Sequence, residues 1–123
     1  MPGRVEFGDW DVEARLETVA RAAGGGFLPS RGDALLSPTK LAERVTVRGW
    51  RHGDRIQPAG MDGSKTLQDL FTDQKVPRDR RAQVPIVESE GEIAWVAGLA
   101  VGERFRAAPD EERVVVLTAR ERG

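Results

Sequence analysis

Positively charged side chains are concentrated in the middle of this 123-residue chain, and residues of this type could bind a negatively charged ligand. Between residues 44 and 81 there are nine Lys and Arg against five Asp, a net charge of +4. The rest of the chain has ten basic and fifteen acidic residues, a net charge of −5. A basic centre inside an acidic frame is the asymmetry expected when one face meets a polyanion. The nine basic residues are Arg44, Arg48, Arg51, Arg55, Lys65, Lys75, Arg78, Arg80 and Arg81.

A glycine-rich segment, Gly60 to Thr66, invites comparison with a phosphate-binding P-loop. That motif needs a glycine, four residues and then Gly-Lys-Ser/Thr. Here Ser64 separates Gly63 from Lys65, and Pro58 stands where the first glycine should be, so the spacing argues against nucleotide hydrolysis. A loop that enters a helix N-terminus could still hold one phosphate beside Lys65, because the helix end carries partial positive charge. A plain capped helix explains the same residues equally well.

Most of the other residues that could take part in catalysis or binding are better explained by structural roles. His52 is the only histidine, and no Ser or Cys stands near it in a recognisable catalytic arrangement. We therefore expect His52 to lie on the surface or in a loop and to have no catalytic role. Asp69 and Asp73 are better explained as exposed ion-pair partners than as an acid/base pair. With no cysteine, neither a disulfide nor a thiolate metal site can form, and we expect no metal or cofactor. Trp95 should be a core residue, whereas Trp50, between two arginines, could be core or could stack on a base.

Flanking segments read as short strands and loops. The runs 4–7 and 10–16 alternate apolar and polar residues around Gly8-Asp9, which predicts a hairpin with Val12, Ala14 and Leu16 on one face. The segment 20–26 ends in three glycines and predicts a loose loop. Residues 37–41 offer one helical turn.

The basic centre itself predicts two short helices joined to brief strands. Residues 45–48 form a β-branched run that should place Arg48 on an exposed face, and residues 55–57 a brief strand. Ser64 or Thr66 can cap a helix that buries Leu67, Leu70 and Phe71 at helical spacing. Pro77 favours a second helix over 76–82, with Arg78 and Arg81 on one face.

After Pro85, short apolar runs at 86–87, 93–96 and 114–117 predict an antiparallel set of strands. The charged terminus 120–123 should fray. The length fits one domain, which we divide into a variable opening (1–43), a basic core (44–85) and closing strands (86–118). We find no apolar run long enough for a membrane span, and the N-terminus lacks the apolar core of a secretory signal, so we expect a cytoplasmic protein.

About half the chain, from Val47 to Phe105, resembles the C-terminal domain of tRNA(Ile)-lysidine synthetase. The resemblance is carried by small motifs in a fixed order. These are Arg48, Arg51, Gly53-Asp54-Arg55, Pro58, Gly60, Gly63, Lys65, Leu67, Leu70-Phe71, Lys75, Pro77, Arg81, Pro85 and Trp95-Val96-Ala97-Gly98.

This resemblance implies an α+β fold: a small domain with an antiparallel β-sandwich-like sheet of unusual topology and two or three short helices, related to a tRNA-synthetase beta-subunit domain. It also implies a function. In the family, a catalytic domain with a Ser-Gly-Gly-x-Asp-Ser loop uses ATP to activate the wobble cytidine, and lysine then displaces AMP. The C-terminal domain helps to hold the tRNA, including its acceptor region. No Ser-Gly-Gly-x-Asp-Ser occurs here, so the chain is either an excised domain or a stand-alone relative.

We therefore expect an accessory domain that binds tRNA(Ile), beside the catalytic domain of the same enzyme, and that orients without catalysing. Its phosphate contacts would come from Arg48, Arg51, Arg55, Lys65, Lys75, Arg78 and Arg81. For Arg55, beside Asp54, a structural ion pair is the competing explanation. The competing function is a protein-interaction module that uses the acidic frame or Trp50 for docking.

Overall fold

A computed structural model describes residues 3–18, 34–41, 44–107 and 111–122. The glycine-rich loop predicted at 20–26 lies outside these residues. The strands are β1 (Gly3–Phe7), β2 (Trp10–Thr18), β3 (Ala34–Leu36), β4 (Thr46–Arg48), β5 (Arg55–Ile56), β6 (Lys65–Thr66), β7 (Ile86–Ser89), β8 (Glu92–Val96), β9 (Ala100–Val101) and β10 (Arg113–Glu121). The helices are α2 (Leu67–Asp73) and two 3-10 helices, η1 (Arg78–Gln83) and η2 (Glu103–Phe105).

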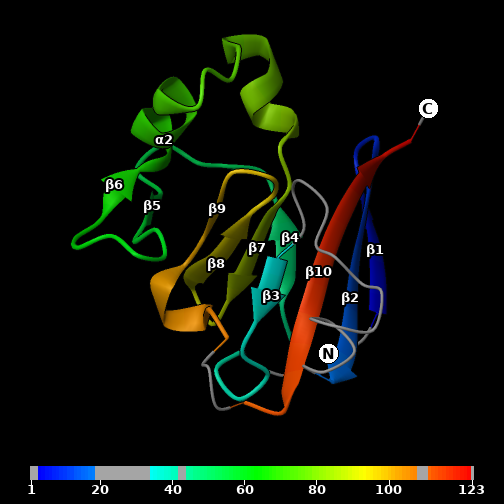
Figure 1. The fold of residues 1–123 in the computed structure, drawn as a ribbon. Coiled ribbons are helices and arrows are strands. Elements are labelled where there is room, and N and C mark those ends of the chain that lie inside the picture. The colour runs from blue at the N-terminus through cyan, green and yellow to red at the C-terminus, as the bar shows by residue number, and fades with distance from the viewer. Residues whose placement is uncertain (1–2, 19–33, 42–43, 108–110, 123) are drawn as a thin grey trace.

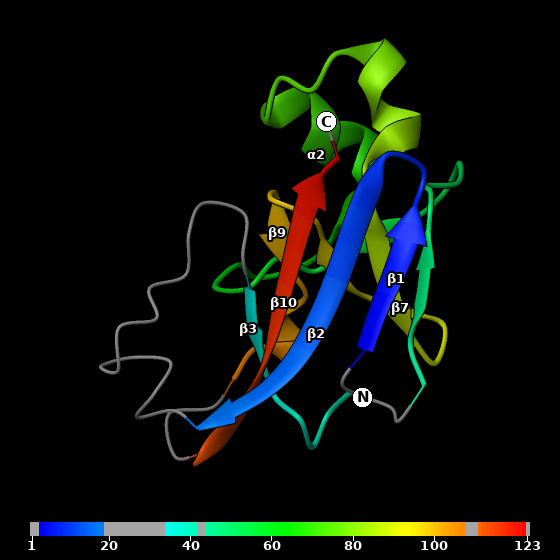
Figure 2. The same ribbon diagram turned by 90° about the vertical axis from the view of Figure 1, so that its right-hand side faces the viewer.

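Two antiparallel sheets form the body of the molecule (Figure 1). One has the strand order β1-β2-β10-β3 and the other β4-β7-β8-β9, while β5 and β6 pair separately. Figure 2 shows β1, β2 and β10 in front of β7 and β9, so the sheets lie in two layers, and α2 and η1 sit at one end. The fold is α+β, as predicted.

The predicted N-terminal hairpin is confirmed. Phe7 lies opposite Trp10 across the two-residue turn Gly8-Asp9, and Gly8 adopts a φ of +56°, a conformation that glycine tolerates best. Of the predicted inward face, Val12 is buried and Ala14 packs against the same core cluster, whereas Leu16 is 40% exposed.

The prediction that the C-terminal residues fray is wrong for the residues that the structure describes. Residues 120 to 122 do not fray: β10 runs to Glu121, which lies opposite Trp10 on β2. The guanidinium of Arg122 donates to Asp11 Oδ1 at 2.6 Å and to the carbonyl of Gly8 at 2.6 Å. The hydrogen bond to Asp11 raises the pKa of Arg122. Pairing with a strand more than a hundred residues away is what orders this end.

The space between the sheets is filled by side chains from both layers. Leu36 and Val115 come from one sheet and Val87 and Trp95 from the other, and all four belong to one buried cluster. Trp95 is 2% exposed, which confirms its prediction as a core residue. Burying a side chain of this size is among the largest single contributions to folding.

A second buried cluster lies beneath α2. It contains Leu67, Leu70 and Phe71, as the helical spacing predicted, packed on Ile56 and Ile86. Thr66 caps the helix by accepting the N–H of Asp69 at 3.1 Å. The second predicted helix is the 3-10 helix η1, which follows Pro77 and begins at Arg78. Together α2 and η1 form a helical lobe at one end of the sandwich (Figure 1).

Candidate nucleic-acid interface

The prediction that Arg48 lies on an exposed face is wrong. Its side chain is only 11% exposed, and it is held by two carboxylates. It donates to both oxygens of Asp54, at 2.9 and 3.1 Å, and to Glu88 Oε2 at 2.9 Å through Nε. Asp54 is itself 13% exposed. The exposed face predicted for Arg48 does not exist, because β7 places Glu88 directly beside β4.

Arg51 stands on a turn that this ion pair holds in place. The carboxylate of Asp54 accepts the backbone N–H of Arg51 at 2.6 Å, and the N–H of Asp54 donates to the carbonyl of Arg51 at 3.0 Å. Burial alone would raise the pKa of Asp54, but the hydrogen bonds from Arg48 and from the Arg51 N–H outweigh it and lower that pKa. The Asp54 carbonyl in turn accepts the N–H of Leu67, the first residue of α2, at 2.9 Å. The turn is therefore tied to both the sheet and the helix.

Arg81 also has a structural role. Its Nε donates to the carbonyl of Val76 at 3.0 Å, and its guanidinium lies 5.7 Å from the centre of the Phe71 ring. Trp50 packs edge-on against the same ring, with the centroids 5.5 Å apart. Trp50 thus belongs with the core cluster under α2, which resolves the alternative left open for it. Although Arg78 and Arg81 lie three apart, only Arg81 is engaged in this way.

Two further predicted residues have partners on the protein surface. Lys65 Nζ lies 2.6 Å from Asp73 Oδ2, so the predicted ion-pair role of Asp73 is confirmed. Arg55 donates to the side chain and carbonyl of Ser64, at 3.2 and 3.3 Å, and the ion pair suspected with Asp54 is made by Arg48 instead. The P-loop-like segment behaves as a capped helix start, since the N–H groups of Leu67 and Asp69 are both hydrogen-bonded within the protein.

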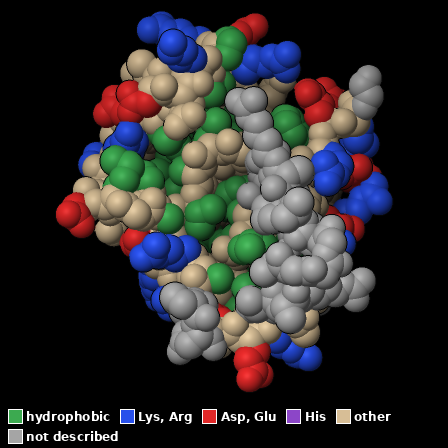
Figure 3. Space-filling model, viewed as in Figure 1, with side chains coloured by type: hydrophobic (Ala, Val, Ile, Leu, Met, Phe, Trp, Pro, Cys, Tyr) green, Lys and Arg blue, Asp and Glu red, His purple; other side chains and the backbone are tan. Residues whose placement is uncertain are grey.

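Arg51, Lys75 and Arg78 are exposed, and in the described part of the chain none of their side chains forms a hydrogen bond or an ion pair with a carboxylate. Lys75 follows α2 in the left-handed conformation, with a φ of 59°. Figure 3 shows some Lys and Arg side chains at the upper edge of the molecule, where Figure 1 places the helical lobe, with Asp and Glu side chains among them. We call these three residues the lobe cations; Lys75 and Arg78 lie on the helical lobe, and Arg51 lies on the turn between β4 and β5. Arg80 on η1 is also exposed, with its Nη1 3.7 Å from Glu121 Oε2; the sequence analysis counted it in the basic centre but not among the phosphate contacts.

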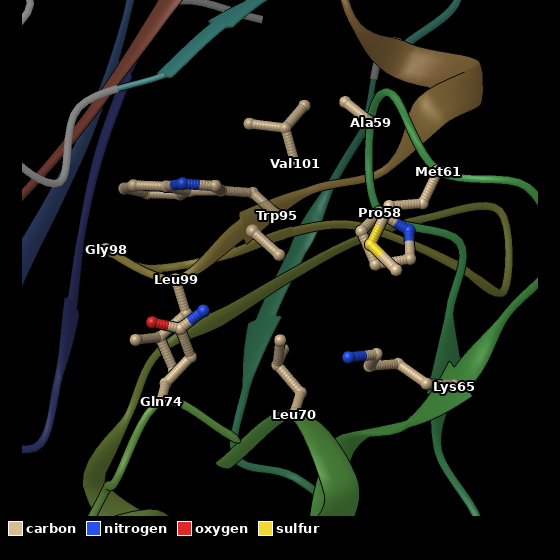
Figure 4. A pocket seen from close by; sticks show the side chains of 11 residues that line it. Pro58, Ala59, Met61, Lys65, Leu70, Gln74, Trp95, Gly98, Leu99 and Val101 are labelled. Atoms are coloured by element: carbon tan, nitrogen blue, oxygen red, sulfur yellow. The ribbon is translucent and has the colours of Figure 1, made fainter. Parts of the chain in front are cut away.

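A groove of about 430 Å³ opens beside the helical lobe, between α2, the loop before β6 and the turn before β9 (Figure 4). Sequence reasoning missed it, because its walls come from segments far apart in the chain. They are Pro58, Ala59, Met61, Lys65, Leu70, Gln74, Trp95, Gly98, Leu99, Ala100 and Val101.

Other kinds of site find little support. His52 is exposed on the turn before Asp54. Within the residues that the structure describes, no three His, Asp or Glu side chains are arranged to hold a metal ion. Nor does any helix in those residues have the length and apolar character that crossing a membrane requires.

Comparison with known proteins agrees with the fold and points to one family. The family model of the TilS substrate C-terminal domain matches residues 45–118. A tRNA(Ile)-lysidine synthase of Symbiobacterium thermophilum is 36% identical over 122 residues, which are 99% of this chain and 25% of the relative. One of Geobacter sulfurreducens is 41% identical over 76 residues, covering 62% of this chain and 16% of the relative.

A solved structure shows the same fold. The crystal structure of a TILS C-terminal domain superposes with a TM-score of 0.80 and 23% identity, over 99% of this chain and 92% of that one. This chain therefore spans a quarter or less of the curated relatives described above, and nearly all of the solved domain. We conclude that it belongs to the family of TilS substrate C-terminal domains.

Proposed function

We propose that this domain binds tRNA through its helical lobe and holds it for the catalytic domain of a tRNA(Ile)-lysidine synthase. The chemistry, addition of lysine to the wobble cytidine with ATP, would be carried out by that other domain. Membership of the family supports a tRNA substrate, since the relatives that share this domain are named for tRNA(Ile).

One observation carries the proposal: the side chains of the lobe cations are exposed and form no hydrogen bond or salt bridge with a carboxylate among the described residues. An arginine already paired with two carboxylates, as Arg48 is, has its charge neutralised and its donors engaged. Unpaired cations instead attract phosphates and release the counterions condensed on them. Such contacts fix the register of an RNA helix, which proteins read mainly by shape.

The elements that carry these cations are held in place by the fold. Arg51 stands on the turn closed by Asp54, and Lys75 on the turn that ends α2, where its N–H donates to the Thr72 carbonyl at 3.1 Å. Arg78 begins η1, whose Arg81 is anchored to Val76. Pre-positioned cations lose less entropy on binding than cations on loose loops.

Binding of a tRNA(Ile) transcript to the 123-residue chain, followed by fluorescence anisotropy at several salt concentrations, tests the proposal. Replacing Lys75 and Arg78 with alanine should weaken binding and flatten the slope of log K against log salt by up to about 2 units if the contacted RNA is duplex. Arg44→Ala is the matched control, because Arg44 is exposed beside the groove between β1 and β4, lined also by Val5 and Val47.

Two results would count against this function. A folded wild-type chain that does not bind tRNA at moderate salt would reject it and favour a protein-interaction module. A double variant with the wild-type slope would remove Lys75 and Arg78 from the binding surface.

A further inference from the structure

The groove beside α2 exposes apolar surface next to the helical lobe. Met61 is 47% exposed at this groove. In Figure 4 the side chains of Met61, Leu70 and Leu99 surround the opening, and Trp95 lies to one side at the upper left. Its volume of about 430 Å³ falls within the range of small-molecule sites.

Two polar side chains reach the same groove. Lys65 Nζ has three N–H donors and spends one on Asp73 at 2.6 Å, so two remain. Figure 4 shows its amino group directed toward the groove from β6. Gln74 is exposed at the end of α2, and its carboxamide makes no hydrogen bond within the described residues, so its donors and acceptor are both available.

We propose that this groove holds one unpaired nucleotide of the RNA that the lobe binds, with Gln74 at the base edge and Lys65 at a phosphate. The inference rests on the proposed function. A nucleobase has apolar faces and a polar edge, which match a groove whose walls offer both apolar and polar surface, including one carboxamide. Proteins that read unpaired RNA splay bases out in this manner, stack them on side chains and hydrogen-bond their edges.

Charge and position favour a nucleotide over an apolar protein side chain. Lys65 lines the groove, and Lys75, one of the lobe cations, directly follows Gln74 in the chain. The pair of Lys65 with Asp73 carries no net charge, so the positive charge beside the groove comes from Lys75. The groove thus lies at the edge of the surface proposed to track the phosphate backbone, and an unpaired nucleotide could enter it without breaking that track.

The test compares two RNAs: a hairpin with a short unpaired 3′ tail, and the same hairpin with a blunt end. Met61→Ala and Gln74→Ala should each weaken binding of the tailed hairpin about five-fold or more, the loss expected from removing one base contact. Binding of the blunt hairpin should not change, and the salt slope should stay as in the wild type, because neither variant removes a cation. Val5→Ala, an equally exposed apolar side chain on β1, is the matched control and should change neither affinity.

The outcomes separate this inference from the function on which it rests. If the wild type binds the tailed hairpin and the two groove variants bind it equally well, the groove does not hold a nucleotide, and a protein segment becomes the better occupant. If both hairpins lose affinity to the same extent in the groove variants, the contact is not specific to unpaired RNA and the inference is wrong. If the wild type binds neither hairpin nor tRNA, the proposed function itself fails.

Discussion

Arg48 and Asp54 form a two-pronged ion pair in which Nη1 lies 2.9 Å from Oδ2 and Nη2 lies 3.1 Å from Oδ1. The same Asp54 oxygen that accepts from Nη1 also accepts the backbone N–H of Arg51 at 2.6 Å. One carboxylate therefore joins the edge strand β4 to the turn that presents Arg51. Arg48 therefore has a structural role, whereas the side chain of Arg51 is available to a ligand.

Removing Arg48 should destabilise the domain substantially. Arg48→Ala leaves two partly buried carboxylates, Asp54 and Glu88, without their cation, and we expect a loss of about 3 kcal/mol in the free energy of unfolding. Urea unfolding measures it. Arg104→Ala, which breaks the exposed pair with Glu92, should cost less than about 1 kcal/mol. Equal losses of unfolding free energy in the two variants would show that the ion pairs of Arg48 contribute no more to stability than an exposed pair does.

Stability should fall in acid partly through Asp54. Its folded-state pKa lies below the ordinary value of 3.8, so the unfolded chain takes up the proton at a higher pH than the folded protein does. The stability from this pairing is complete above the unfolded pKa and is lost as the pH falls through the lowered folded value. Unfolding free energies at about pH 7 and about pH 3 should differ less in Asp54→Asn than in the wild type. An identical difference in both proteins would exclude Asp54 as a contributor.

Phe71 should be the residue of α2 most sensitive to truncation. It is fully buried beneath Trp50 and Arg81, and Phe71→Ala should cost about 3 to 5 kcal/mol in stability. Asp73→Ala, on the solvent side of the same helix, should cost under about 1 kcal/mol because it breaks only a surface pair with Lys65. Thermal or urea unfolding of both variants decides the point, and similar losses would mean that α2 does not pack as described.

Arg81 and Arg78 should behave differently although they are three residues apart. Arg81→Ala removes the hydrogen bond to the Val76 carbonyl and the contact with the Phe71 ring, so we expect a stability loss of about 1 to 2 kcal/mol and an unchanged salt slope for tRNA binding. Arg78→Ala should leave stability nearly unchanged and lower the salt slope by about one unit. A lowered slope in Arg81→Ala would return Arg81 to the set of phosphate contacts.

Gly102 should resist enlargement. A Cβ at this position would lie 2.7 Å from the carbonyl oxygen of Ile93 and 3.3 Å from the Phe105 ring. Backbone cannot move aside cheaply there, because the N–H of Gly102 donates to the Ala94 carbonyl at 2.8 Å. Gly102→Ala should therefore cost about 1 to 3 kcal/mol in unfolding free energy, whereas Gly3→Ala, with open space around it, should be nearly neutral. Equal stabilities for the two variants would contradict the close approach of η2 to β8.

Local patterns were sufficient to predict several elements, whereas the α+β fold class came from the family resemblance. The spacing of Leu67, Leu70 and Phe71 predicted the buried face of α2, and Thr66 predicted its cap. The turn Gly8-Asp9 between alternating runs predicted the hairpin of β1 and β2. These succeed because periodicity, capping and tight turns depend on residues only a few positions apart.

Which cations are available to a ligand was decided by tertiary structure. Charge density marked Arg48 and Arg81 as strongly as Lys75 and Arg78, but an ion pair or a ring contact depends on which residues the fold places nearby. Glu88 reaches Arg48 only because β7 pairs with β4, forty positions along the chain. The groove beside α2, and the order of residues 120 to 122, likewise arise from segments distant in sequence. By itself the sequence determined where positive charge is concentrated and which local elements carry it; only the folded arrangement decided which charges are neutralised, because electrostatic pairing depends on separation in space and on burial.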